Sequence, residues 1–202
     1  KASDGTLKHL TRINGDQAVD FVRNSIPKQP FCLSVSFSAP HPEDDNVRQY
    51  IYDRELEHLY RGVTIPSPPV SEPKYFEQLP GFLRVSMNRQ RWFRRFDTPE
   101  KYQRMMKAMY RLITGVDIQI GRILDEIRKQ GVEDNTIIVF TSDNGLLTGE
   151  HGITGIWLMY EPSIRVPLII HDPRRPEASR GKTVSELALN VDYEPTLLDL
   201  AG

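Results

Sequence analysis

Hydrophobic residues along this chain follow two patterns, one typical of strands and one typical of helices. Residues 137–140 and 166–170 are apolar throughout, and each run predicts a strand that is buried on both faces; the first is interpreted as a parallel strand. Residues 31–37 combine apolar side chains with serine and predict a third buried strand. Cys32 lies inside this run and is interpreted as a small core side chain.

Other segments carry apolar residues at helical spacing. The longest helix is expected to begin behind Thr98, because a capping threonine, a proline at the first helical position and Glu100 in the first turn are typical of a helix start. Its period continues until Gly131, which is expected to mark its C-terminal end. Shorter helices are predicted over residues 15–26 and 191–200.

Residues 42–97 show no sustained period and are rich in proline, charged and aromatic residues. Such a long irregular segment is unusual in a compact domain unless it serves a site, so we interpret it as an insertion that lines a substrate cleft or covers the fold. The order helix, strand, long helix, strand, strand, helix predicts one α/β domain, with a mostly parallel or mixed central sheet flanked by helices.

Composition and charge narrow the possible classes of function. The 202 residues are 39% hydrophobic and 26% charged, which is ordinary for a globular domain. Twenty-six basic residues against 27 acidic ones leave a formal net charge of −1, which gives no support to a nucleic-acid-binding protein. No segment approaches the roughly 20 apolar residues that span a bilayer, so no membrane span is expected. The oligomeric state does not follow from the sequence.

Two loops carry candidate chemistry. The strand over residues 137–140 leads into Asp143 and Asn144, and ligands in α/β sheets bind beyond the carboxyl ends of strands. A carboxylate beside an amide carbonyl offers oxygen ligands to Ca²⁺ or Mg²⁺, although Asp-Asn-Gly is equally typical of a tight turn. His41 follows the strand over residues 31–37, but a histidine beside proline in a loop is more often structural. The residues alone leave these alternatives open.

Several segments, spread in order over most of the chain, resemble the sulfatase family of the alkaline-phosphatase-like superfamily. They are Phe37-Ser38-Ala39-Pro40-His41-Pro42, Thr141-Ser142-Asp143-Asn144-Gly145, Gly149-Glu150-His151-Gly152, and residues 111–117, 157–170 and 193–202. The resemblance implies an alkaline-phosphatase-like fold and the hydrolysis of sulfate esters of carbohydrates or other small organic molecules. It also suggests a secreted or periplasmic location.

The resemblance implies roles for individual residues. Asp143 and Asn144 match two ligands of the active-site divalent cation, usually Ca²⁺. His41 matches the histidine that contacts the sulfate group, and it is therefore the expected catalytic and substrate-binding residue. An imidazole there can donate a hydrogen bond to a sulfate oxygen or assist proton transfer at the leaving group.

Two departures from the family pattern limit these expectations. The Cys-x-Pro-Ser-Arg motif that sulfatases convert to a formylglycine nucleophile is absent, and Cys32 lacks that context. The aspartate pair that completes the metal site is absent as well, so the chain resembles the later part of a catalytic domain and is expected to be inactive alone. Many relatives carry a sulfate-binding lysine where this chain has Ile156. Either another cation substitutes for it, or the protein handles sulfate weakly or not at all.

Alternative functions stay open at this point. Phosphoryl and sulfuryl groups share a shape, so a phosphodiester or phosphonate-ester hydrolase of the same superfamily is one alternative. A catalytically silent relative that binds a ligand is the other, and Ile156 favours it.

Arg91, Arg94 and Arg95 form a basic cluster among aromatic residues. A solvated surface is the simpler interpretation of this cluster, although sulfated-sugar recognition uses the same residue types.

Overall fold

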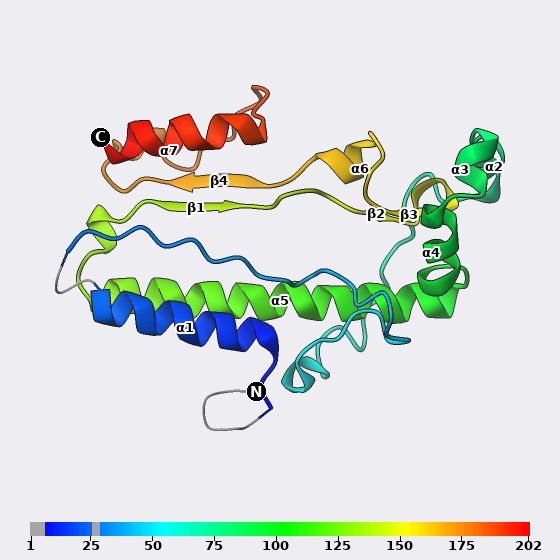
Figure 1. Ribbon diagram of the computed structural model, residues 1–202, viewed down its shortest axis with the longest axis horizontal. Helices are drawn as coiled ribbons and strands as arrows, with labels where there is room; N and C mark the ends of the chain where they lie inside the picture. Colours follow the sequence, from blue (N-terminus) through cyan, green and yellow to red (C-terminus); the bar gives the residue numbers. More distant parts are fainter. Residues whose placement is uncertain (1–6, 26–28) are drawn as a thin grey trace.

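A computed structural model describes residues 7–25 and 29–202 (Figure 1). Its longest element is helix α5, Pro99–Lys129, and helix α1, Leu10–Ser25, packs along it. Thr98 caps α5 by accepting a hydrogen bond from the Lys101 backbone N at 3.2 Å. Gly131, at φ +69°, follows the last turn. The predicted start and end of the long helix are therefore confirmed. No helix in the described part of the chain is long and apolar enough to cross a membrane.

Gly15 lies inside α1 rather than at its start, contrary to the prediction. It is buried where α1 meets α5, and a Cβ atom there would lie 2.3 Å from Gln119 Oε1 and 2.9 Å from Gln119 Cβ. A glycine inside a helix costs about 1 kcal/mol relative to alanine, but here it permits close packing of the two helices. The predicted end of this helix, at residue 26, lies outside the described residues.

We expect Gly15→Ala to lower the free energy of unfolding by about 1–3 kcal/mol, because the added methyl group pushes α1 away from α5. Gly121→Ala is the matched control, since Gly121 lies in α5 with no atom within 4 Å of its Cβ position. The control is expected to raise stability by about 0.5–1 kcal/mol. Urea denaturation measures both changes, and equal effects would show that the contact at Gly15 does not constrain the helix pair.

The strands form two antiparallel pairs within the described residues. Strand β1, Ile138–Thr141, pairs with β4, Leu168–His171. Strand β2, Leu147–Thr148, pairs with β3, Thr154–Gly155. The expectation of buried strands over residues 137–140 and 166–170 is wrong, since Phe140 is 39% exposed and Ile169 is 59% exposed. The parallel direction expected of the first strand is also wrong, because β1 pairs antiparallel with β4. An apolar run indicates that a strand can be buried on both faces, but it encodes neither strand direction nor the neighbours that cover it.

Residues 31–37 form no strand with any described residue, which corrects the third strand prediction. The segment runs extended between α5 and β1 in Figure 1, with alternate side chains partly covered. Cys32 is exposed and is not a core residue. The local pattern therefore specifies an extended chain, whereas a strand also requires a partner for its backbone groups.

Residues 42–97 are not irregular throughout, as was expected. They contain three short α-helices, which are α2 (Pro73–Glu77), α3 (Gly81–Arg84) and α4 (Met87–Arg95). These helices span nine residues at most, so they are too short to show a clear hydrophobic period. Helix α2 contacts the turn at Glu150–Gly152, and α4 contacts β3. This part of the chain therefore packs against the β2–β3 pair and the turn between its strands.

The main core lies between α5 and the segment that precedes α4. Its buried residues are Tyr50, Ile65, Phe96, Tyr102, Met105, Met106, Ala108, Met109 and Leu112. A smaller cluster joins α3 to the β2–β3 pair, through Leu79, Leu83, Leu147 and Ile153. The remaining helices are α6, Glu161–Ile164, and α7, Tyr193–Ala201, which fits the helix predicted over residues 191–200. In Figure 1 the β1–β4 pair lies between α5 and α7.

Candidate functional site

The loop between β1 and β2 carries the predicted metal ligands. Asp143 and Asn144 are both exposed. Asp143 Oδ1 accepts a hydrogen bond from the Asn144 backbone N at 2.8 Å, and Asn144 Nδ2 donates to the carbonyl of Gly145 at 2.8 Å. No described donor bonds Asp143 Oδ2 or Asn144 Oδ1. The sequence Asp-Asn-Gly thus forms a bend held by hydrogen bonds of its own side chains and leaves two oxygen atoms available to a ligand.

Gly145 fixes this loop against α6. Its backbone N donates to Ser163 O at 2.9 Å, and the next residue, Leu146, donates to Pro162 O at 2.7 Å. A Cβ atom at position 145 would lie 2.1 Å from Pro162 O. Only glycine permits this approach of two backbones, so the position of Asp143 depends on the absence of a side chain two residues later.

The donor atoms of Asp143 and Asn144 fit a hard divalent cation in kind but not in number. Ca²⁺ in proteins takes six to eight oxygen ligands. No group of three or more His, Cys, Asp or Glu side chains within residues 7–25 and 29–202 could hold a metal. The two residues therefore offer oxygen atoms of the right kind, and a divalent cation would need further ligands beside them.

His41 lies in a loop after the extended segment. Its side chain is exposed, and its backbone N donates to Ser38 O at 2.9 Å. His41 also lines a small cavity of about 50 Å³ with His9 and Ile51. The imidazole is therefore accessible to a ligand, while its backbone is held by the chain.

Asp44 connects the His41 loop to helix α4. Its carboxylate pairs with Arg91 at 2.5 Å and with Arg95, and Arg95 Nε donates to Gln49 Oε1 at 2.8 Å. Burial by itself raises the pKa of Asp44, but a hydrogen bond from Arg91 and the charges of Arg95, Arg91 and His41 hold that pKa below its ordinary value. The carboxylate is therefore ionised at neutral pH and fixes the loop to the helix.

Arg95 is 1% exposed, so the interpretation of the basic cluster as a solvated surface is wrong for this residue. Burial lowers the pKa of Arg95, and the charges of Tyr50 and Asp44 oppose that change. Tyr50 is also 1% exposed, and burial raises its pKa to about 12. Arg94, by contrast, is exposed as expected. The sequence missed the buried pair because its partners, Asp44 and Arg95, lie far apart along the chain.

Helix α4 also positions the loop that contains Ile156. Asn88 Nδ2 donates to Thr154 O at 3.0 Å and to Ile156 O at 3.1 Å. One residue further along α4, Arg89 Nη1 donates to Gly152 O at 2.7 Å. Asn88 is 5% exposed, so these bonds are shielded from water. The backbone at Ile156 is therefore anchored to the same helix that holds the His41 loop.

Trp157 follows in an unusual conformation. Its φ is +76°, in the left-handed region that residues other than glycine rarely adopt. The guanidinium of Arg91 lies over the indole ring, 4.6 Å from its centroid, and Trp157 is 62% exposed. The structure thus brings the His41 loop and the Ile156–Trp157 loop to one helix. The described contacts of Asp143, however, stay within its own loop, apart from one with Asn190.

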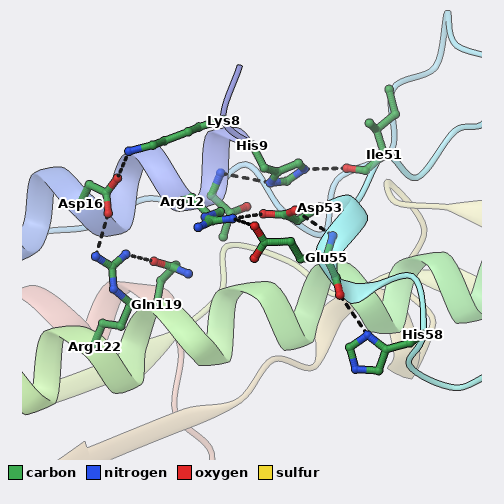
Figure 2. A network of polar contacts seen from close by, with 11 residues as sticks. Lys8, His9, Arg12, Asp16, Ile51, Asp53, Glu55, His58, Gln119 and Arg122 are labelled. Carbon is green, nitrogen blue, oxygen red and sulfur yellow. Dashed lines mark hydrogen bonds and ion pairs between the residues drawn. The ribbon is translucent and has the colours of Figure 1, made fainter. Parts of the chain in front are cut away.

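The larger cavity of the described structure contains none of the predicted site residues. Its volume is about 440 Å³, and it lies between α1, α5 and the segment around residues 51–58. Figure 2 shows the polar network there, in which Arg12 pairs with Asp53 and Glu55, and Arg122 pairs with Asp16. Four cationic and three anionic side chains line this cavity, and the ion pairs among them connect α1 to its neighbours.

The family can now be assigned. A sequence model of the family described as Sulfatase matches residues 2–202. The chain belongs to the sulfatase family. This sulfatase chain is 47% identical over 102 residues to an N-acetylglucosamine-6-O-sulfatase of Bacteroides thetaiotaomicron, a match that covers 50% of the chain and 18% of that protein. It is 31% identical over 197 residues to choline-sulfatase of Rhizobium meliloti, covering 97% of the chain and 34% of that protein.

Solved structures agree with this assignment. A protein solved in complex with its substrate D-glucosamine-2-N,6-O-disulfate matches the sulfatase chain with a TM-score of 0.75 and 29% identity, over 97% of this chain and 49% of that one. Phosphonate monoester hydrolase from Silicibacter pomeroyi matches with a TM-score of 0.77 at 23% identity, over 98% of this chain and 41% of that one. The similarity to the phosphonate monoester hydrolase shows a shared fold alone, because the identity is only 23%. The predicted alkaline-phosphatase-like α/β class is confirmed, as is membership in a family of sulfuric ester hydrolases.

Proposed function

We propose that this chain is the later part of the catalytic domain of a metal-dependent sulfatase that hydrolyses sulfate esters of a saccharide or another small organic molecule. The observation that carries the proposal is the Sulfatase match over residues 2–202, which includes His41, Asp143 and Asn144. The similarity to an N-acetylglucosamine-6-O-sulfatase supports a sugar substrate. The matched segments cover 18% and 34% of the two relatives, which supports a longer enzyme that contributes further residues to the site.

In this enzyme His41 contacts the substrate directly. Its exposed imidazole donates a hydrogen bond to a sulfate oxygen, or donates a proton to the leaving oxygen as the sulfate ester bond breaks. The loop that carries His41 is tied to α4 through Asp44, Arg91 and Arg95. A side chain presented from such a fixed loop loses little further freedom when the substrate binds.

Asp143 and Asn144 would hold a divalent cation, with Ca²⁺ preferred because both residues offer oxygen atoms. When bound, such a cation neutralises charge on the sulfate oxygens. The hydrogen bonds from Gly145 and Leu146 to α6 hold the backbone of this loop in place. We expect the other metal ligands and the formylglycine nucleophile to come from parts of the longer enzyme outside these 202 residues.

The 202-residue chain alone is expected to bind Ca²⁺ weakly and to show no multiple turnovers of an aryl sulfate, because it supplies part of the metal site and no nucleophile. Calorimetric titration measures the binding. Asp143→Ala should abolish the residual heat, whereas Asp134→Ala, which removes an exposed carboxylate elsewhere, should leave it unchanged. Tight stoichiometric binding that survives Asp143→Ala would place the cation elsewhere and contradict the proposed site.

The choice of substrate class is tested on the longer enzyme. Rates with an aryl sulfate, an aryl phosphodiester and an aryl phosphonate monoester are compared at one pH and one calcium concentration. The proposal requires the highest kcat/KM for the sulfate ester. A preference for either phosphorus substrate would replace it with the alternative hydrolase, and a folded, metal-bound enzyme without turnover of any of them would indicate a silent relative.

A further inference from the structure

The surroundings of Ile156 contain a cation on the neighbouring helix. Asn88 bonds the carbonyl of Ile156 at 3.1 Å, and Arg91 lies one helical turn further along the same face of α4. Arg91 Nη1 is 3.8 Å from the Cβ position of Gly155, and its guanidinium covers the ring of Trp157. Arg91 therefore lies close to both neighbours of Ile156, Gly155 and the side chain of Trp157.

Arg91 is able to bind an anion without leaving a buried charge unpaired. Its one described hydrogen bond runs from Nη2 to Asp44 Oδ2, whereas a guanidinium has five N–H donors. Asp44 is also paired with Arg95, so two positive charges face one negative charge in this cluster. An anion that draws on Arg91 still leaves Asp44 with a partner. The side chain of Arg91 is 17% exposed, and partial shielding from water strengthens an ionic contact.

Two further observations connect the guanidinium of Arg91 with the proposed site at His41. His41 lies three residues before Asp44 in the same loop, and Arg91 pairs with Asp44, so the ion pair joins Arg91 to the loop that carries His41. Trp157 holds the guanidinium by a cation–π contact, in a backbone conformation whose strain is typical of functional sites. An anion that His41 contacts would therefore lie close to a guanidinium that is already oriented.

We propose that Arg91 binds the sulfate group of the substrate and supplies the positive charge that Ile156 lacks. This inference rests on the proposed function, since it assigns a further substrate-binding residue to the same sulfatase site. A guanidinium presents paired N–H groups that match two sulfate oxygens. Arg91 thus decides whether the enzyme recognises a sulfate ester in the absence of a cation at position 156.

The test compares variants of the longer enzyme in two measurements. Calorimetric titration with sodium sulfate, against sodium chloride at equal ionic strength, gives the affinity for free sulfate. Kinetics with an aryl sulfate give kcat and KM. Arg91→Met is expected to weaken sulfate binding and kcat/KM by about tenfold to a hundredfold, the loss of one charge-assisted contact. Arg94→Met is the matched control on the same helix, because Arg94 is exposed, and its values should stay within about twofold of the wild type.

A double variant tests the placement of the sulfate beside residue 156. Ile156→Lys in the Arg91→Met background returns a cation to the neighbouring position, so we expect it to recover most of the lost sulfate affinity. A double variant as weak as Arg91→Met would contradict this placement. If Arg91→Met does not fold, Arg91→Gln carries the same test, since glutamine keeps a donor to Asp44 without the charge.

The outcomes separate this inference from the proposed function. Sulfate affinity that is unchanged in folded Arg91→Met overturns the role of Arg91, even if the wild type hydrolyses sulfate esters well. A wild-type enzyme that hydrolyses only phosphorus esters overturns the proposed function. In that case, the difference in sulfate binding between the wild type and Arg91→Met still reports on Arg91.

Discussion

Replacing His41 by alanine in the longer enzyme is expected to lower kcat for an aryl sulfate by about 100- to 10,000-fold, the contribution of a positioned general acid or base. The imidazole is exposed at a loop that Asp44 ties to α4. Alanine cannot donate a proton or a hydrogen bond from this position. Steady-state kinetics at saturating substrate measure the loss.

The matched control is His58→Ala. His58 is exposed, and its Nδ1 is bonded to Glu55 O at 2.9 Å, so it is expected to leave kcat within about twofold. A series of aryl sulfates with leaving groups of different acidity then identifies the role of His41. If His41 protonates the leaving oxygen, the loss should shrink as the leaving group becomes more acidic; if it only binds the sulfate, the loss should be constant. Unchanged kcat throughout the series would remove His41 from the site.

Asp44→Ala is expected to lower the free energy of unfolding by about 3 kcal/mol. Loss of the carboxylate leaves the buried guanidinium of Arg95 without its charged partner, and breaking a buried ion pair costs about 3–5 kcal/mol. We expect the lower end of this energy range because the side chain of Asp44 is 33% exposed, although that of Arg95 is only 2% exposed. Glu161→Ala is the matched control, since it breaks an ion pair with Arg165 in which both side chains are more than two-thirds exposed. It should cost less than about 1 kcal/mol.

The effect of Asp44→Ala is expected to depend on pH. The pKa of Asp44 in the folded chain lies below its ordinary value of 3.8, so the folded state favours the ionised carboxylate. The stabilisation is therefore present above about pH 4 and is lost as the pH falls through the pKa of the folded state. Urea denaturation of the wild type and Asp44→Ala between pH 7 and pH 3 should give curves that converge at low pH. A constant difference over this range would indicate that the ionised carboxylate is not the stabilising group.

Part of this molecule follows from local patterns in the sequence. Thr98 and the residues after it determine the start of α5, because capping and helix propensity act within one turn. The apolar runs place β1 and β4 to within two residues of their observed bounds. Asp143 and Asn144 are identified by their place behind β1, and the ordered motifs identify the sulfatase family. Each single motif, helix start and apolar run depends on residues that are close together in the chain.

The tertiary structure decided the features that depend on distant residues. Strand direction and the exposure of Phe140 depend on which elements lie beside β1, and a period in the sequence carries no such information. The burial of Arg95 does not follow from its neighbours in the sequence, because its charged partner, Asp44, lies in another segment. Arg91 and Ile156 are also distant in the sequence. They lie close together in the structure because Asn88, on the same helix as Arg91, donates a hydrogen bond to the carbonyl of Ile156. The sequence by itself determined the family and the helix and strand propensities, and folding decided which charges meet, because electrostatic contacts depend on distance in space.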